Sequence, residues 1–225
     1  MEQKSVALDG PAGAGKSTLA KRTAEHFGLI YVDTGALYRC IGLFVYRNGV
    51  DSRDTAGVSA LLPGIDIRIE YDETGIQRMF LCDEDVTDAI RMPEISTYAS
   101  DVSAMPEVRA FLLNMQQEMA VKYNVLMDGR DIGTVVLPDA GLKIFITADT
   151  DKRAERRYLE LAAKGVKTTF QEVKDAMVQR DKNDSERAAA PLKAADDAIV
   201  LDTTDLDLDE SFSALCRLIS GRFNL

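Results

Sequence analysis

The chain has 225 residues, 46% hydrophobic and 28% charged, which is ordinary for a soluble globular protein, and we expect one domain over residues 1–225. The net charge of -10 argues against a nucleic acid or an anionic membrane as partner, because either would favour a basic face. No apolar run approaches the roughly 18 residues of a membrane-spanning helix, and Met1–Lys4 leads into an apolar segment without a signal-peptide core.

The cysteines and the single histidine limit the chemistry further. Cys40, Cys82 and Cys216 are far apart and have neither metal-ligand spacing nor a disulfide framework, so we expect reduced thiols and a cytoplasmic protein. We also expect a monomer, since no large apolar surface stripe is evident. His26 is the only histidine and lies in a helical segment, so the mechanism is expected to work without a histidine base.

The first apolar segment, Ser5–Leu8, precedes a loop that fills every position of the phosphate-binding motif G-x-x-x-x-G-K-[ST]. A helical pattern over Thr18–Ala24 follows, and strand, glycine loop and helix in this order are the context that the motif needs. The alternative is a glycine-rich turn without a ligand. We predict that the loop binds ATP or GTP through Gly10, Pro11, Ala12, Gly13, Ala14, Gly15, Lys16, Ser17 and Thr18.

Two side chains of the loop have specific predicted roles. Lys16 would reach the β- and γ-phosphates as a catalytic residue. The Ser17 hydroxyl would bind Mg²⁺.

Polar residues follow the second apolar run, at a point where ligands gather in open parallel sheets. Asp33, Thr34 and Arg39 lie there, and the guanidinium of Arg39 suits bidentate contact with a phosphate. Thr34 has an alternative interpretation as the N-cap of the next helix.

Between Asn48 and Pro106 the pattern changes. Ile65–Glu70 alternates apolar and polar residues, and Gln77–Leu81 would return antiparallel to it after a turn at Asp72–Gly75. A small antiparallel unit therefore interrupts the parallel pattern. Helices are expected over Glu107–Lys122, Phe170–Gln179 and Glu210–Arg222. The near-continuous apolar runs typical of buried parallel strands are Val6–Leu8, Leu29–Val32, Val125–Met127, Leu142–Ile146 and Ala198–Leu201.

Asp128 ends the third of these runs, where it could hold Mg²⁺ through water or orient a substrate. Arg130 and Asp131 beside it enlarge this candidate site, and their alternative interpretation is a structural ion pair.

Arginines gather in the last third of the chain. Arg180, Asp184 and Arg187 stand at i, i+4 and i+7, which is one face of a helix, although a solvated helix would look the same. With Arg153 and Arg157 they suggest an arginine-bearing lid that excludes water and places cations on a phosphoryl group in transfer.

Taken together, these stretches resemble the bacterial cytidylate kinase family over nearly the whole chain. The matching segments are Leu8–Pro11 with the GAGKS loop, DTGALYR at 33–39, DGRDIGTVV at 128–136 and RDKNDSERAAAPLKAADDAIVLDTT at 180–204. Departures are small: Lys182 and Asn183 stand where some members carry another arginine, and Ser17 stands where some have glycine.

The resemblance implies an α/β fold, the P-loop NTPase three-layer sandwich with a five-stranded parallel sheet, a small antiparallel β-containing insert and an arginine-rich lid. The monophosphate-binding region with its insert would cover about 34–110, and the lid about 149–187. The implied reaction is phosphoryl transfer from ATP to CMP or dCMP, with Mg²⁺.

The resemblance also implies roles for single residues. Thr34 and Arg39, with Asp33 beside them, would lie at the CMP phosphate. Ser100 and Arg109 would approach cytosine, and Asp131 would accept from its amino group. The remaining assignments are Arg130 between the phosphates, Arg180 and Asp184 at the ribose, Arg187 at the monophosphate, and Arg153 and Arg157 over ATP, with Lys16, Arg130, Arg157 and Arg180 as catalytic residues.

Two alternatives stay open at this point. A kinase for another monophosphate, such as AMP or UMP, would share the phosphate loop. A nucleotide-hydrolysing switch or binding module is the other, although the sequence has no N-K-x-D guanine-reading element.

Overall fold

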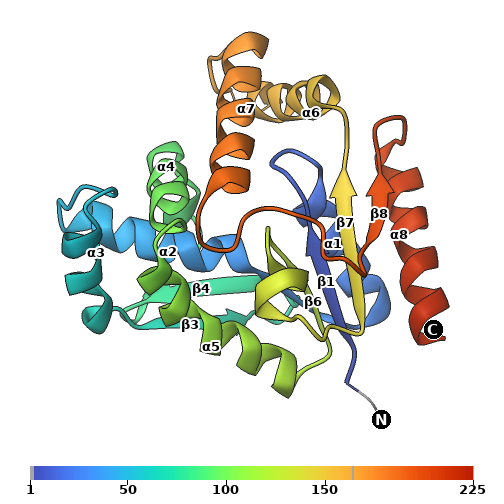
Figure 1. Ribbon diagram of the computed structural model, residues 1–225, viewed down its shortest axis with the longest axis horizontal. Helices are drawn as coiled ribbons and strands as arrows, with labels where there is room; N and C mark the ends of the chain where they lie inside the picture. The colour runs from blue at the N-terminus through green and yellow to red at the C-terminus, as the bar shows by residue number, and fades with distance from the viewer. Residues whose placement is uncertain (1–2, 164, 225) are drawn as a thin grey trace. The chain divides into compact units, whose positions relative to one another are not determined.

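The computed structural model describes residues 3–163 and 165–224, and the chain divides into two compact units (Figure 1). The first comprises the segments up to Tyr31 and from Met119 onward, and the second is Val32–Glu118. The predicted single domain, its region at 34–110 and its lid at 149–187 stay predictions. Among the described residues, no helix is both long enough and apolar enough to cross a membrane.

A five-stranded parallel sheet forms the centre of the first unit, which confirms the predicted fold class. The strand order is β2-β6-β1-β7-β8, so β1 lies between β6 and β7. In the register, Leu8 stands beside Asp128 on one side and Ile144 on the other. The carboxyl ends of these strands therefore share one edge. The strands are β1 (Ser5–Asp9), β2 (Ile30–Asp33), β6 (Val125–Asp128), β7 (Leu142–Thr147) and β8 (Ile199–Asp202), close to the five predicted runs.

Two helices pack against this sheet through one hydrophobic cluster. Leu19 of α1 (Lys16–Phe27) and Leu215 and Ile219 of α8 (Leu208–Phe223) are buried with Leu8 of β1. A short π-helix, η3 (Ile132–Val136), follows β6, and π-turns of this kind are frequent at functional sites.

The helices α6 (Thr150–Ala163) and α7 (Phe170–Glu186) follow β7. Thr169 begins α7 with a capping box, in which its hydroxyl accepts from the Glu172 N–H while the Glu172 carboxylate accepts from the Thr169 N–H. The helix extends to Glu186, beyond the predicted end at Gln179.

The second unit has its own core and a three-stranded antiparallel sheet in the order β3-β4-β5. The predicted pair corresponds to β3 (Ile67–Tyr71) and β4 (Gln77–Leu81), and β5 (Glu84–Asp85) adds a short third strand. Buried residues from the helices and strands, such as Leu37, Ile95 and Met79, form the core. The other elements are α2 (Thr34–Arg47), α3 (Thr55–Leu61), η1 (Leu62–Gly64), η2 (Ala89–Arg91), α4 (Pro93–Val102) and α5 (Pro106–Lys122), whose last turn belongs to the first unit.

Gly10 marks the point where β1 passes into the loop, and its position excludes any side chain. Its φ is 146°, and a Cβ there would lie 2.0 Å from the backbone oxygen of Ile146 on β7. Gly28, which ends α1, also has positive φ at 63°, but nothing lies within 4 Å of the point that a Cβ would occupy. Gly10 is therefore required both by its backbone conformation and by the close approach of β7, whereas Gly28 is required by its backbone conformation alone.

We predict that Gly10→Ala lowers the free energy of unfolding by about 3 kcal/mol or more, since it adds overpacking to an unfavourable backbone conformation. Gly28→Ala, the matched control, should cost only about 1–2 kcal/mol. Denaturant unfolding of both variants measures the difference. Equal losses would show that the strand-to-loop junction tolerates a side chain.

Candidate functional site

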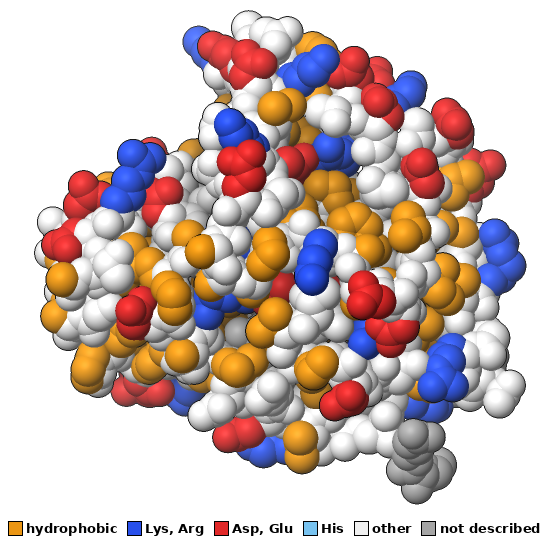
Figure 2. Space-filling view, viewed as in Figure 1, with side chains coloured by type: hydrophobic (Ala, Val, Ile, Leu, Met, Phe, Trp, Pro, Cys, Tyr) orange, Lys and Arg blue, Asp and Glu red, His pale blue; other side chains and the backbone are white. Residues whose placement is uncertain are grey.

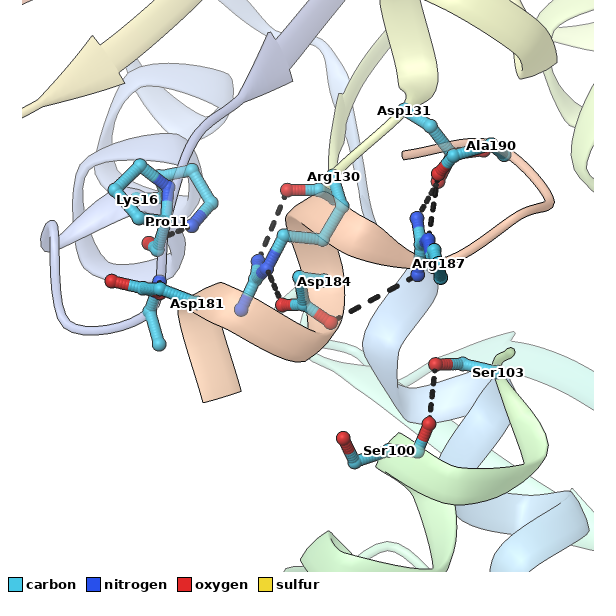
Figure 3. Close-up of polar contacts among 12 residues, drawn as sticks. Pro11, Lys16, Ser100, Ser103, Arg130, Asp131, Asp181, Asp184, Arg187 and Ala190 are labelled. Atoms are coloured by element: carbon cyan, nitrogen blue, oxygen red, sulfur yellow. Dashed lines mark hydrogen bonds and ion pairs between the residues drawn. The ribbon is translucent and has the colours of Figure 1, made fainter. Parts of the chain in front are cut away.

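Lys16 lies buried at the start of α1, immediately after Gly15 in left-handed conformation. Its Nζ donates to the backbone oxygen of Pro11 at 2.8 Å, so the ammonium turns back over its own loop (Figure 3). Burial lowers the pKa of Lys16, and the neighbouring guanidinium of Arg130 lowers it further.

The groups that act on the Lys16 ammonium are the polar residues predicted from separate stretches of the chain. The carboxylates of Asp128 and Asp9 raise its pKa, whereas Arg180 lowers it, as Arg130 does. The structure therefore brings the predicted catalytic residues Lys16, Arg130 and Arg180 within electrostatic reach of one another. Such a cluster of cations is suited to hold a polyphosphate.

Asp128 is buried at the end of β6, with hydrogen bonds to both of its oxygens. The Ser17 hydroxyl donates to Oδ2 at 2.7 Å, and the Tyr31 hydroxyl donates to Oδ1 at 3.2 Å. A hydroxyl and a carboxylate are hard oxygen ligands of the kind Mg²⁺ prefers, and that ion usually keeps several waters and takes further oxygens from phosphates. Within the described residues, no group of three or more His, Cys, Asp or Glu is placed to hold a metal. The pair fits a magnesium ion shared with a nucleotide.

Two ion pairs join the loop after β6 to the end of α7 (Figure 3). Arg130 Nε lies 2.9 Å from Asp184 Oδ2, and Arg187 Nη2 lies 3.1 Å from Asp131 Oδ1. Arg130 and Asp131 thus each form an ion pair with a residue of the segment 180–187, and a structural ion pair was the alternative interpretation of these two residues. Arg187 Nε also donates to the oxygen of Ala190 at 2.6 Å.

Arg187 lies differently from the helical face that its spacing suggested. It is the C-cap residue of α7, with an extended ψ of 140°, so the helical i+7 position is wrong for it. Its guanidinium nevertheless lies 4.0 Å from Asp184 Oδ1. The turn that follows α7, and not a shared helical face, therefore brings Arg187 close to Asp184.

The two lid arginines occupy unlike environments. Arg157 is half-exposed and pairs with Glu160 on its own helix at 2.7 Å. Arg153 is buried, and it donates to backbone oxygens of Ala12 and Ala148. Direct contact of either with ATP stays a prediction.

In the second unit, Asp33 is buried at the start of α2 and caps that helix by accepting from the Ala36 N–H at 3.1 Å. The N-cap interpretation of Thr34 is therefore wrong, because Thr34 is already the first helical residue. Arg39 Nη1 lies 3.7 Å from Asp33 Oδ2, and Arg91 Nη2 lies 3.2 Å from the same oxygen.

Ser100 and Arg109, both of the second unit, lie on either side of one serine. Arg109 Nη1 donates to the backbone oxygen of Ser103 at 3.1 Å, and the Ser103 hydroxyl donates to the backbone oxygen of Ser100 at 2.8 Å. The Arg109 guanidinium also lies 5.5 Å from the ring centroid of Tyr38. The structure thus brings together two of the residues assigned to cytosine.

Comparison with known proteins identifies the family of the chain. The family model described as cytidylate kinase matches residues 6–220. The chain belongs to the cytidylate kinase family. A cytidylate kinase of Caldicellulosiruptor bescii is 49% identical over 97% of this chain and 96% of its own, and one of Exiguobacterium sibiricum is 46% identical over 98% and 99%. The resemblance seen in the sequence is confirmed.

A solved structure supports the fold alone. An uncharacterized protein from Eubacterium ventriosum has a TM-score of 0.53 and 16% identity, and the match covers 98% of this chain and 100% of the other.

This member of the cytidylate kinase family has a further buried carboxylate, Asp9, that the sequence analysis did not assign. Its two oxygens accept from the N–H groups of Ile132 and Gly133, both at 2.8 Å, and so fix the start of η3 next to β1. Burial raises the pKa of Asp9 to about 6, against the lowering effect of those two hydrogen bonds. The sequence signal that could have identified Asp9 is an acidic residue at the end of the strand that precedes the phosphate-binding loop.

We predict that the stability advantage of wild type over Asp9→Asn shrinks as the pH rises from 4 to 7, by up to about 3 kcal/mol. The folded-state pKa lies above the ordinary 3.8, so the folded protein holds this proton more tightly. Its stabilising contribution is complete below pH 3.8 and is lost as the pH rises through about 6. Denaturant unfolding of both proteins across this range measures it, and parallel stability curves would contradict the raised pKa.

Proposed function

We propose that this chain transfers the γ-phosphoryl group of ATP to CMP or dCMP, giving ADP and CDP or dCDP. The observation that carries the proposal is the cluster that the buried Lys16 forms with the partly exposed Arg130 and Arg180 at the phosphate-binding loop, in a member of the cytidylate kinase family. An oxygen of the CMP phosphate attacks the γ-phosphorus, and the bond to the β,γ-bridging oxygen breaks, so that ADP leaves. Such a transfer depends on positioning and charge neutralisation and needs no histidine.

The donor side is proposed as follows. The loop residues Gly10–Ser17, with Thr18, bind the ATP phosphates, and Lys16 leaves the Pro11 oxygen to meet them. Arg157 and Arg180 contribute cations during the transfer, and Arg153 belongs to the same side. Ser17, and Asp128 through water, would hold Mg²⁺, which supplies further neutralisation of the phosphate charge.

The acceptor residues are proposed for each unit by itself. In the first unit, Arg130, Asp131, Arg180, Asp184 and Arg187 are proposed to bind CMP. In the second unit they are Asp33, Thr34, Arg39, Ser100 and Arg109. Arg39 supports this assignment, because its buried Nη1 has no hydrogen-bond acceptor among the described residues and is suited to an anion.

Selection of cytosine is proposed to rest on Asp131. Cytosine presents an amino donor where uracil presents a carbonyl, so a carboxylate accepts from CMP and repels UMP. The ion pair of Asp131 with Arg187 fixes the orientation of this carboxylate.

We also propose a cytoplasmic monomer whose partners are nucleotides. The free thiols of Cys40, Cys82 and Cys216 suit a reducing compartment. The net charge is -10, and Figure 2 shows acidic and basic side chains interspersed on the face that it displays, which disfavours a nucleic acid or anionic membrane as partner.

A coupled ADP-release assay with Mg·ATP and a panel of AMP, CMP, dCMP, UMP and GMP tests the proposed acceptor. We expect fast turnover with CMP and dCMP, and slow or undetectable turnover with the others. Lys16→Ala, purified in the same way, is the control for contaminating kinases and should lose at least about 10³-fold in turnover. Faster turnover with AMP or UMP would show that the acceptor is not CMP or dCMP. ADP release without any acceptor would favour a nucleotide-hydrolysing switch.

Asp131→Asn should raise the KM for CMP at least about 10-fold and bring the CMP and UMP specificities closer, because the amide no longer offers a charged acceptor. The KM for ATP should stay within about 2-fold. Asp139→Asn, an exposed aspartate in the same region, is the matched control. Unchanged CMP turnover in Asp131→Asn would remove this residue from cytosine selection.

A further inference from the structure

One peptide of the phosphate-binding loop is held on both sides by charged side chains. The Ala12 N–H donates to Asp181 Oδ1 at 3.1 Å, and the Ala12 oxygen accepts from Arg153 Nη1 at 2.9 Å. Arg153 Nη1 also lies 2.5 Å from Asp181 Oδ2. The two side chains and the Ala12 peptide thus form a closed set of three mutual contacts, which we call the Ala12 clamp.

The remaining nitrogens of Arg153 anchor the clamp to the turn between β7 and α6. Nε donates to the Ala148 oxygen and Nη2 donates to the Thr150 hydroxyl, each at 3.0 Å. The Arg153 side chain is only 7% exposed and that of Asp181 19%. Because burial makes an unpaired charge costly, loss of either partner would leave the other uncompensated next to the loop.

Helix α7 meets the loop at a second point, one turn before Asp181. Met177 packs against Gly13, where a Cβ would lie 2.5 Å from the Met177 methyl carbon. Residues 177 and 181 are separated by one helical turn and so lie on the same face of α7. The loop therefore rests on a face of this helix and is held there by one apolar and one charged contact.

The same helix carries residues of the proposed acceptor side. Arg180 precedes Asp181 and acts on the Lys16 ammonium, and Asp184 follows and pairs with Arg130 (Figure 3). A rigid helix fixes the spacing of these three side chains. The position of the loop relative to Arg180 and Asp184 consequently depends on the Asp181 contact.

We propose that Asp181, with Arg153, is a positioning residue that fixes the phosphate-binding loop to α7 and thereby sets where ATP lies relative to Arg180 and Asp184. This inference rests on the proposed function. Arg153 has a second effect, since it neutralises a carboxylate that would otherwise repel the triphosphate. Asp181 acts through the Ala12 peptide and needs no contact with either nucleotide.

The test compares Asp181→Ala and Asp181→Asn in the full chain, with Asp175→Asn as control. Asp175 lies exposed on the same helix, where it accepts from Gln171. Isothermal titration with Mg·ATP alone measures donor binding, and steady-state kinetics give kcat and both KM values. Thermal unfolding reports the effect on stability.

Asp181→Ala is expected to weaken ATP binding about 10-fold and to lower kcat by a similar factor, while the KM for CMP stays within about 3-fold. Asp181→Asn keeps an acceptor for the Ala12 N–H and should lose less. A purely structural role would lower the unfolding temperature and leave ATP affinity unchanged. ATP affinity and kcat at wild-type levels in Asp181→Ala would overturn the proposal.

The neutralisation of the Asp181 carboxylate by Arg153 is tested separately. Arg153→Met leaves Asp181 unpaired, so adding Asp181→Asn to it should restore part of the lost ATP affinity. A double variant that binds ATP more weakly than Arg153→Met would contradict this. If Arg153→Met fails to fold, the Asp181 variants alone decide.

The donor titration also separates this inference from the proposed function. Wild type that binds ATP but phosphorylates no pyrimidine monophosphate would refute the proposed function, while the ATP affinities would still decide on the clamp. Wild type that phosphorylates CMP, together with Asp181→Ala of normal affinity and kcat, would refute the clamp alone.

Discussion

The buried ammonium of Lys16 sets the electrostatic requirements that the rest of the first unit meets. Burial alone would drive this group toward its neutral form, and Arg130 and Arg180 act in the same direction. Asp9 and Asp128 oppose them, although burial raises the pKa of Asp9 itself to about 6. A bound polyphosphate would supply the further negative charge that three neighbouring cations favour.

The parallel sheet makes this cluster possible. The register of β1 and β6 places Leu8 beside Asp128, so the carboxyl ends of the two central strands deliver Asp9 and Asp128 to one edge. Gly10 lets the chain leave that edge past the Ile146 oxygen without a clash. The two ion pairs to the end of α7 then hold Arg130 and Asp131 in fixed orientations. Pre-oriented charges need little reorganisation when a reaction begins, which is how such sites act.

The strands and the loop could be predicted from sequence because their signals are local. A buried strand is a short apolar run, and the phosphate-binding loop needs glycines at fixed positions, as at Gly10 and Gly15. The family motifs also pointed to Arg130, Asp131 and Asp184 before any contact was known. What they could not give was the pairing, since Arg130–Asp184 and Asp131–Arg187 join positions far apart in the chain.

Other differences have equally physical causes. Asp33 caps α2 in place of Thr34 because the start of a helix can shift by one residue when two polar residues adjoin. Arg153 was predicted to lie over ATP, which stays a prediction, and the sequence did not reveal that its guanidinium contacts Ala12 and Asp181. Asp9 had no predicted role because its partners are backbone N–H groups, which a sequence does not reveal.

The most direct test of the central claim is ³¹P NMR of Mg·ATP and CMP mixed with the wild-type chain. The account predicts that ADP and CDP appear in equal amounts without inorganic phosphate, because the γ-phosphoryl group passes to the acceptor. Accumulation of inorganic phosphate with CMP unchanged would show hydrolysis, and would contradict the assignment of the arginine cluster to phosphoryl transfer between nucleotides.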